Sequence, residues 1–313
     1  MEAIKDFEDF YRVKIEPQLP DFKAAGKIIE QWRIAAIVSG IIFIGALAGY
    51  VFDIITEAAF SLILLSGTVL AISVYKYFKK DNNYVDDFKH RIVQEVIDHL
   101  HAGLVYKPDE LIAEKEYRQS GLFRRNYDYY EGDDFIEGIY KGVGFHCSEL
   151  HTQYDSYSRR NRVITIFKGL FFAARANSGY TGGTYVWIKG EEQLGASIAD
   201  EAYRLIHFPE VREIKMGHAI FDTYYTVCST NPAEAREILN EELMNNLLRF
   251  RKQVHRKVVF SVVMGRCYVA IPIDEDIFEP ADEPDDKEAI KKYFFGVLLV
   301  LSIINQLNLG RLQ

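Results

Sequence analysis

Two uncharged apolar runs, IAAIVSGIIFIGALAGYVF at residues 34–52 and AAFSLILLSGTVLAISVY at residues 58–75, decide the fold of this chain. Only five residues separate them. A nineteen-residue helix, the length of the first run, rises about 28 Å, close to the ~30 Å hydrocarbon thickness of a bilayer. The pair therefore predicts a transmembrane helical hairpin. A hairpin buried in a soluble core is disfavoured, because neither run carries a polar stripe beyond a few Ser and Thr residues.

Positive charges flank this pair of runs on both outer sides and are absent from its connection. Arg33 precedes the first run, and Lys76, Lys79 and Lys80 follow the second. The connecting residues DIITE contain two acids and neither Lys nor Arg. Since positive residues favour the cytoplasmic side, we expect these four residues at the inner membrane border and both chain termini in the cytoplasm.

Residues 1–33 precede the hairpin as an amphipathic helix and a lead-in to the first span. Apolar residues recur at helical spacing over 3–15, and Pro17 and Pro20 are expected to end this helix. Acidic residues dominate its polar face, whereas membrane-surface helices favour basic ones. Packing on the soluble domain is therefore favoured over packing on the bilayer.

The hairpin is expected to occupy residues 34–80, and residues 81–313 are expected to form a cytoplasmic domain. Asp81–Asn83 should break the second helix. An amphipathic helix would then run to Leu100, and Pro108 would begin a short further helix.

The later sequence alternates between strand and helix patterns. Strands are predicted at 163–174, 184–188, 218–228, and 258–264 with 267–273, the last two joined by a Gly265-Arg266 turn. Helices are predicted at 233–251 and 286–306. The last helix is apolar only over 293–304, too short a stretch to span a bilayer, so we expect it in the core. The pattern predicts an α+β domain of mostly antiparallel or mixed strands covered by helices.

The net charge of −8 is concentrated in one segment. Residues 274–288 hold nine acids and one Lys, which leaves the rest of the chain neutral. No basic field for nucleic acid is present. The acidic segment is either an ordinary solvated loop or a docking strip for a basic partner.

Several blocks together resemble a known bacterial family, the domain of unknown function numbered 3137. The similarity extends over about residues 85–310 and implies a bacterial protein of the inner membrane, since members often carry a preceding membrane hairpin. It implies no activity, substrate or cofactor. The blocks are SGLF at 120–123, YEGDD at 130–134, FHCSEL at 145–150, IFKGLFF at 166–172, FDTYYTVCS at 221–229 and NPAEAREILNEELMNNLL at 231–248.

Three carboxylates within these blocks are candidates for chemistry. Asp133, Asp134 and Glu149 could bind a divalent metal or act as general acid and base. The structural alternative is that Asp133 serves a turn after Gly132 and that Glu149 pairs with an Arg.

The cysteines and histidines form no recognisable metal or nucleophile motif. On a strand, His146 and Cys147 would point to opposite faces, whereas Cys147 and His151 would share one. Two ligands make a poor zinc site. Cys228 and Cys267 lie in predicted strands, where burial would disfavour the thiolate. We therefore predict neither a metal nor a cofactor.

Two basic clusters remain as candidate binding residues. Each could attract anionic lipid or a partner, and the alternative is a solvated surface, with cations favoured at a helix C-terminus. The first cluster lies in a predicted loop and the second at a helix end: Arg159, Arg160 and Arg162; Arg251, Lys252, Arg256 and Lys257.

These features favour a membrane-anchored cytoplasmic interaction or scaffold module, in contact with the bilayer and a protein partner, over an enzyme. Two alternatives stay open. One is a membrane-tethered hydrolase that uses the three carboxylates, and the other is a small-ligand sensor with a cavity in the sheet domain.

Overall fold

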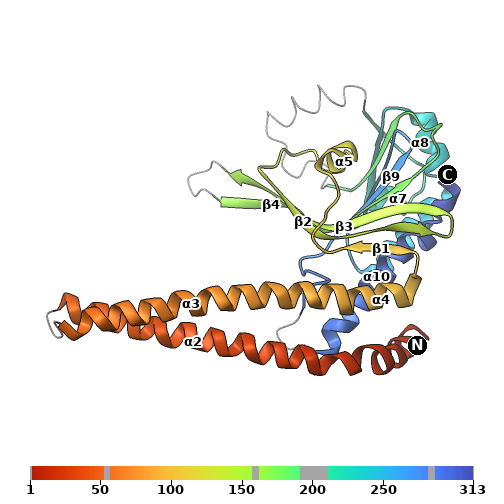
Figure 1. The fold of residues 1–313 in the computed structure, drawn as a ribbon. Helices are drawn as coiled ribbons and strands as arrows, with labels where there is room; N and C mark the ends of the chain where they lie inside the picture. The colour runs from red at the N-terminus through yellow and green to blue at the C-terminus, as the bar shows by residue number, and fades with distance from the viewer. Residues whose placement is uncertain (1, 53–56, 157–161, 191–210, 281–285, 313) are drawn as a thin grey trace. The chain divides into compact units, whose positions relative to one another are not determined.

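The computed structural model describes residues 2–52, 57–156, 162–190, 211–280 and 286–312 (Figure 1). The chain divides into two compact units. The helical unit comprises Met1–His99 with Phe278–Phe294, and the sheet unit comprises Leu100–Ile277 with Phe295–Gln313. The long helix α10, Lys287–Leu307, contributes residues to both.

The helical unit contains a long pair of helices, α2 and α3, that run side by side (Figure 1). The chain enters through α1, Glu2–Phe10, a π-helical turn at Tyr11–Ile15 and a 3-10 turn at Glu16–Gln18. The next helix, α2, covers Leu19–Val51, with Pro20 in its first turn, where the missing N–H has no helical partner to lose.

The second helix of the pair continues further than the sequence predicts. α3 covers Glu57–Phe88 and passes through Asp81–Asn83, where we expected a break. A π-helical turn and α4, Gln94–His101, extend it. Tyr84 and Phe88 pack against Phe22, with ring centroids 5.8 and 5.2 Å apart. This packing outweighs the weak helix preference of the polar residues just before it.

Side chains of α1 pack within the same unit. The ring of Phe7, which is fully buried, packs edge-on against the ring of Phe294, with centroids 5.4 Å apart. The ring centroids of Phe10 and His99 lie 4.4 Å apart. The amphipathic N-terminal segment thus buries its apolar face against protein.

Among the described residues, three helices are long and apolar enough to cross a membrane by length and composition: Ile4–Val51, Phe60–His101 and Lys287–Leu307. The third is a correction, because we judged its apolar stretch too short. Burial separates it from the others. In the most apolar window, 56% of α10 is buried inside the protein, against 17% and 11% for the first two helices.

The sheet unit holds an antiparallel sheet of nine described strands, ordered β1-β2-β3-β4-β9-β8-β5-β7-β6. Together with the long N-terminal helices it confirms the α+β class. The strands are β1 Leu104–Lys107, β2 Tyr129–Tyr140, β3 Val143–Ser156, β4 Arg162–Arg175, β5 Gly183–Ile188, β6 Arg212–Ile214, β7 Tyr225–Ser229, β8 Val259–Val263 and β9 Arg266–Pro272.

Both faces of this sheet carry large buried side chains. On one face, α5 (Glu114–Gln119) places Tyr117 against Phe171, with ring centroids 5.3 Å apart. On the other face, Phe145 stacks on Phe172 at 5.4 Å. The middle strands are therefore apolar on both sides, which explains the nearly continuous apolar run of β4.

Local capping and turn chemistry corrects four sequence expectations. Residues 218–228 form the short helix α7, Phe221–Tyr224, before β7. The helix expected at 233–251 is two helices, α8 Pro232–Ile238 and α9 Glu241–Val254, because Asn240 caps the second. The β8–β9 turn is Met264-Gly265, both with positive φ, one residue before the expected position. The short helix expected from Pro108 begins only at Glu114, as α5, and strand β1 ends just before Pro108.

Candidate functional site

A basic groove of about 970 Å³ lies on the sheet unit at the C-terminal end of α9. Its described walls come from the α7 region, from α9 and from the residues just after α9, and none of these lining residues belongs to a strand. The lining residues are Ile220, Tyr224, Asn245, Leu248, Arg249, Arg251, Lys252, His255, Arg256 and Lys257.

The sequence of α9 explains how these residues come together. The Asn240 side chain accepts a hydrogen bond from the backbone N–H of Leu243 at 2.9 Å and fixes the start of the helix. Leu243, Leu247 and Phe250 are buried on one side, which leaves Lys252 exposed on the other. His255 ends the helix in a left-handed conformation, with φ 51°.

The groove is electropositive, because none of the described residues that line it is acidic. The Arg251 guanidinium lies over the Tyr224 ring, 4.5 Å from the centroid, as in a cation–π pair. Arg249 donates to the Asn246 side chain. Cations at a helix C-terminus also interact favourably with the helix dipole, so part of this arrangement stabilises α9 itself.

Two buried polar atoms next to the groove lack hydrogen-bond partners among the described residues, Arg251 Nε and the hydroxyl of Tyr225. Burial raises the pKa of Tyr225, and the charge of Arg251 acts in the opposite direction. Buried polar atoms are normally hydrogen-bonded, so these two atoms are exceptions that need a structural explanation.

Of the predicted basic residues, the structure brings Arg251, Lys252, Arg256 and Lys257 into one groove. Arg162 is exposed at the start of β4, and Arg159 and Arg160 lie outside the described residues. Sequence reasoning missed the apolar wall of Ile220 and Tyr224, since the FDTY segment was expected to be a strand.

The four predicted border residues lie along the long helices. Arg33 is exposed on α2, where it pairs with Glu30 at 2.8 Å. Lys76, Lys79 and Lys80 are exposed on α3. Their role at a membrane border stays a prediction.

The three predicted carboxylates also come together, at a bulge in β2. Asp133 and Glu149 are cross-strand partners, and the register shifts directly after Asp133. The buried Asp134 has φ 56° and accepts a hydrogen bond from the Tyr106 hydroxyl. Asp134, not Asp133, thus occupies the strained position.

Glu149 is held by a backbone group and not by the Arg suggested as an alternative. Its two carboxylate oxygens lie 2.9 and 3.1 Å from the N–H of Ile277. Burial first, and the charge of Asp134 next, raise the pKa of Glu149 to about 8. The cluster could attract a divalent cation through its acidic oxygens, but Asp134 and Glu149 already bind the Tyr106 hydroxyl and the Ile277 N–H.

The histidine and cysteine candidates separate as strand alternation predicts. His146 pairs with Glu116 on α5 at 2.8 Å, on the face opposite Cys147. Burial opposes ionisation of Glu116, but His146 and Arg266 together hold its pKa below the usual value. Burial raises the pKa of the Cys147 and Cys267 thiols, so neither is poised as a nucleophile.

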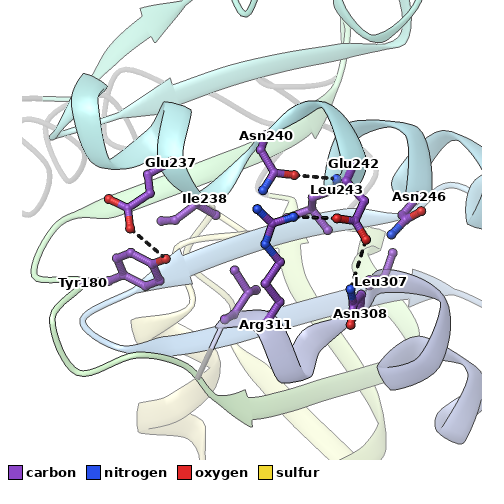
Figure 2. A pocket seen from close by; sticks show the side chains of 11 residues that line it. Tyr180, Glu237, Ile238, Asn240, Glu242, Leu243, Asn246, Leu307, Asn308 and Arg311 are labelled. Atoms are coloured by element: carbon purple, nitrogen blue, oxygen red, sulfur yellow. Dashed lines mark hydrogen bonds and ion pairs between the residues drawn. The ribbon is translucent and has the colours of Figure 1, made fainter.

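A smaller hollow of about 150 Å³ lies where the C-terminal 3-10 turn, Leu309–Leu312, meets α8 and α9 (Figure 2). Its polar side chains bind one another. Glu242 accepts hydrogen bonds from Asn308, at 3.0 Å, and from Arg311, and the Tyr180 hydroxyl faces Glu237 at 3.5 Å (Figure 2). This internal pairing suits docking of the C-terminal segment better than recognition of a small ligand.

Comparison with known proteins bears on the sheet unit. Residues 165–309 match the model of a family described as "Protein of unknown function (DUF3137)". The match confirms the predicted family resemblance over that range and includes the whole basic groove. The carboxylate cluster precedes the matched range, and the resemblance predicted for 85–164 stays a prediction.

One solved structure is similar, the crystal structure of the mycobacterial trehalose monomycolate transport factor A, TtfA. It shares 12% sequence identity over 68% of this chain and 96% of that chain, with a TM-score of 0.32. No curated protein matches the chain. At this TM-score the similarity assigns neither fold nor function.

Proposed function

We propose that this protein is a membrane-anchored interaction module. The paired helices α2 and α3 lie in the bilayer, and the sheet unit engages a partner at its cytoplasmic surface. Both termini are cytoplasmic, and the membrane is the bacterial inner membrane.

The observation that carries the proposal is the exposed apolar surface of α2 and α3. Ile41, Ile44 and Leu64 are each 66% exposed. Contiguous apolar surface of this kind is rare on soluble monomers and marks contact with lipid or protein. Polar side chains within the two helices form hydrogen bonds inside their own helix. The hydroxyls of Ser39 and Ser66 donate to backbone carbonyls one turn earlier, at 2.7 and 2.6 Å. Such back-bonding removes unsatisfied groups, as a bilayer requires.

The interaction role is supported by an open strand edge in the sheet unit. β4 pairs with β3 from Arg162 to Ala174 but with β9 only from Gly169 onward, and the Lys168 carbonyl also accepts from the Ile273 N–H. Among the described strands, residues 162–167 of β4 therefore pair on one side alone, and Val163 there is 51% exposed. Exposed apolar strand edges accept a further strand from a partner.

Photo-crosslinking in native membranes tests the partner. A photoreactive residue at position 163 should capture a protein partner identified by mass spectrometry. The same residue at position 139, where Ile139 is also exposed on a strand, serves as the matched control. Equal capture at both positions, or none at 163, would count against this edge as the interaction surface.

The orientation has its own test. A reporter fused after Gln313 should be active only when the reporter works in the cytoplasm, because positive charges flank both spans. Activity of a periplasmic reporter there would overturn the proposed topology.

A carboxylate-dependent hydrolase is the second candidate, favoured by the raised pKa of Glu149 beside two aspartates. A raised carboxyl pKa is a feature of general acids. In an unbiased hydrolase panel, turnover that disappears in Asp133→Asn and Glu149→Gln would establish this function in place of the interaction module.

A further inference from the structure

We propose that the basic groove at the end of α9 binds the headgroup of an anionic phospholipid. The inference rests on the membrane anchoring proposed above, because an anchored chain is surrounded by lipid headgroups at high local concentration.

The groove concentrates positive charge. Arg249, Arg251, Lys252 and Arg256 line it, and its described lining contains no acid. Like charges that lie close together repel one another, and a bound anion would relieve the repulsion. Near an anionic membrane surface, each such cation contributes further attraction.

The groove also has an apolar wall. Ile220 and Tyr224 are exposed, at 60% and 44%, and line the same groove together with Leu248. A free phosphate ion would gain nothing from these apolar side chains. The glycerol and upper acyl carbons of a lipid would cover them while the phosphate meets the cations.

Arg251 presents a guanidinium group to the groove. It lines the groove and stacks on Tyr224, with its guanidinium carbon 4.5 Å from the ring centroid. A phosphodiester group is an anion that an Arg side chain recognises well.

Lipid is favoured over an acidic peptide because of the groove's walls. The described lining residues belong to helices and loops, so an extended peptide would find no strand edge among them with which to pair its backbone. Recognition would rest on side-chain cations alone, which suits a headgroup.

The test uses the full chain purified in detergent and titrated with short-chain phosphatidylglycerol or phosphatidylcholine, with binding followed by native mass spectrometry. The groove variant Lys252→Glu/Arg256→Glu changes two exposed cations of the lining. The matched control Lys115→Glu/Arg236→Glu changes the net charge equally at two exposed cations outside it. Melting curves verify that both variants fold.

We expect wild type and control to prefer phosphatidylglycerol, and the groove variant to bind it at least about tenfold more weakly. An Arg251→Gln variant should lose the preference as well. Equal affinity in the groove and control variants, or no preference for phosphatidylglycerol in the wild type, would overturn the proposal. Displacement of the lipid by millimolar inorganic phosphate, or tighter binding of an oligoglutamate peptide, would also overturn it in favour of those ligands. Because binding is measured in detergent, failure here leaves the membrane-anchoring test unaffected.

Discussion

The pair α2–α3 and the helix α10 are all apolar enough to cross a bilayer, yet they expose very different fractions of that surface. The most apolar windows of the first two long helices are 17% and 11% buried, and that of α10 is 56% buried. Ile44 on α2 is largely exposed, whereas Ile303 on α10 is fully buried. Length and composition therefore do not distinguish an exposed apolar helix from a core helix, and burial does.

The largest difference in stability should appear when the same side-chain atoms are removed from α10 and from α2. Ile303→Ala leaves a cavity in the protein core and should cost about 2–5 kcal/mol of unfolding free energy. Ile44→Ala, at a position that is 66% exposed, should cost less than about 1 kcal/mol. Thermal melting of the full chain in detergent measures both. Equal losses would mean that Ile44 is packed against protein in the native state.

Burial of a carboxyl offers a second test of the sheet unit's interior. The pKa of Glu149 is raised from 4.5 to about 8, so the folded state holds this proton more tightly than the unfolded chain. The stabilisation is complete below the unfolded value and is lost as pH rises through about 8. Stability should fall by on the order of 3 kcal/mol between about pH 5 and about pH 9.

Glu149→Gln should flatten this pH dependence, measured by melting temperature across the pH series. Glu131→Gln, at an exposed position of the same sheet, should leave it unchanged. An unaltered slope in Glu149→Gln would show that Glu149 titrates normally.

A smaller contrast concerns two asparagines in helices. Asn240 caps α9 and so positions the groove, whereas Asn82 is exposed within α3. Asn240→Ala should destabilise the protein by about 1 kcal/mol, and Asn82→Ala should be neutral or slightly stabilising. Melting curves compare them, and a neutral Asn240→Ala would remove the capping role.

The smallest expected difference separates two glycines of the hairpin. A Cβ on Gly67 would lie 3.1 Å from the Phe43 ring, while one on Gly45 would meet nothing within 4 Å. Both substitutions gain helix propensity, but in Gly67→Ala the close contact with Phe43 should offset part of that gain. The stabilities of the two variants should therefore differ by up to about 1 kcal/mol. Melting in detergent resolves the pair, and identical behaviour would show that Phe43 adjusts freely.

The sequence predicted the features that depend on local pattern. Spacing and composition predicted the apolar runs, most strands of the sheet and the cluster of basic residues after Phe250. The helix through Asp81–Asn83 was not, because it depends on contacts of Tyr84 and Phe88 with Phe22, some sixty residues away.

The groove shows the same limit. Its cations are adjacent in sequence, but its apolar wall at Ile220 and Tyr224 comes from a segment whose aromatic spacing resembles a strand. Only the folded chain brings that wall to the end of α9. Likewise, Asp133 and Glu149 become neighbours through the register of β2 and β3, which a bulge shifts directly after Asp133.

Carbonate extraction tests whether α2 and α3 are buried in lipid. Bacterial membranes that contain the full chain are washed with alkaline carbonate, which removes peripheral proteins and leaves integral ones. We expect the chain to stay in the membrane pellet and a variant lacking residues 34–75 to be released. Recovery of the intact chain in the carbonate supernatant would contradict this expectation.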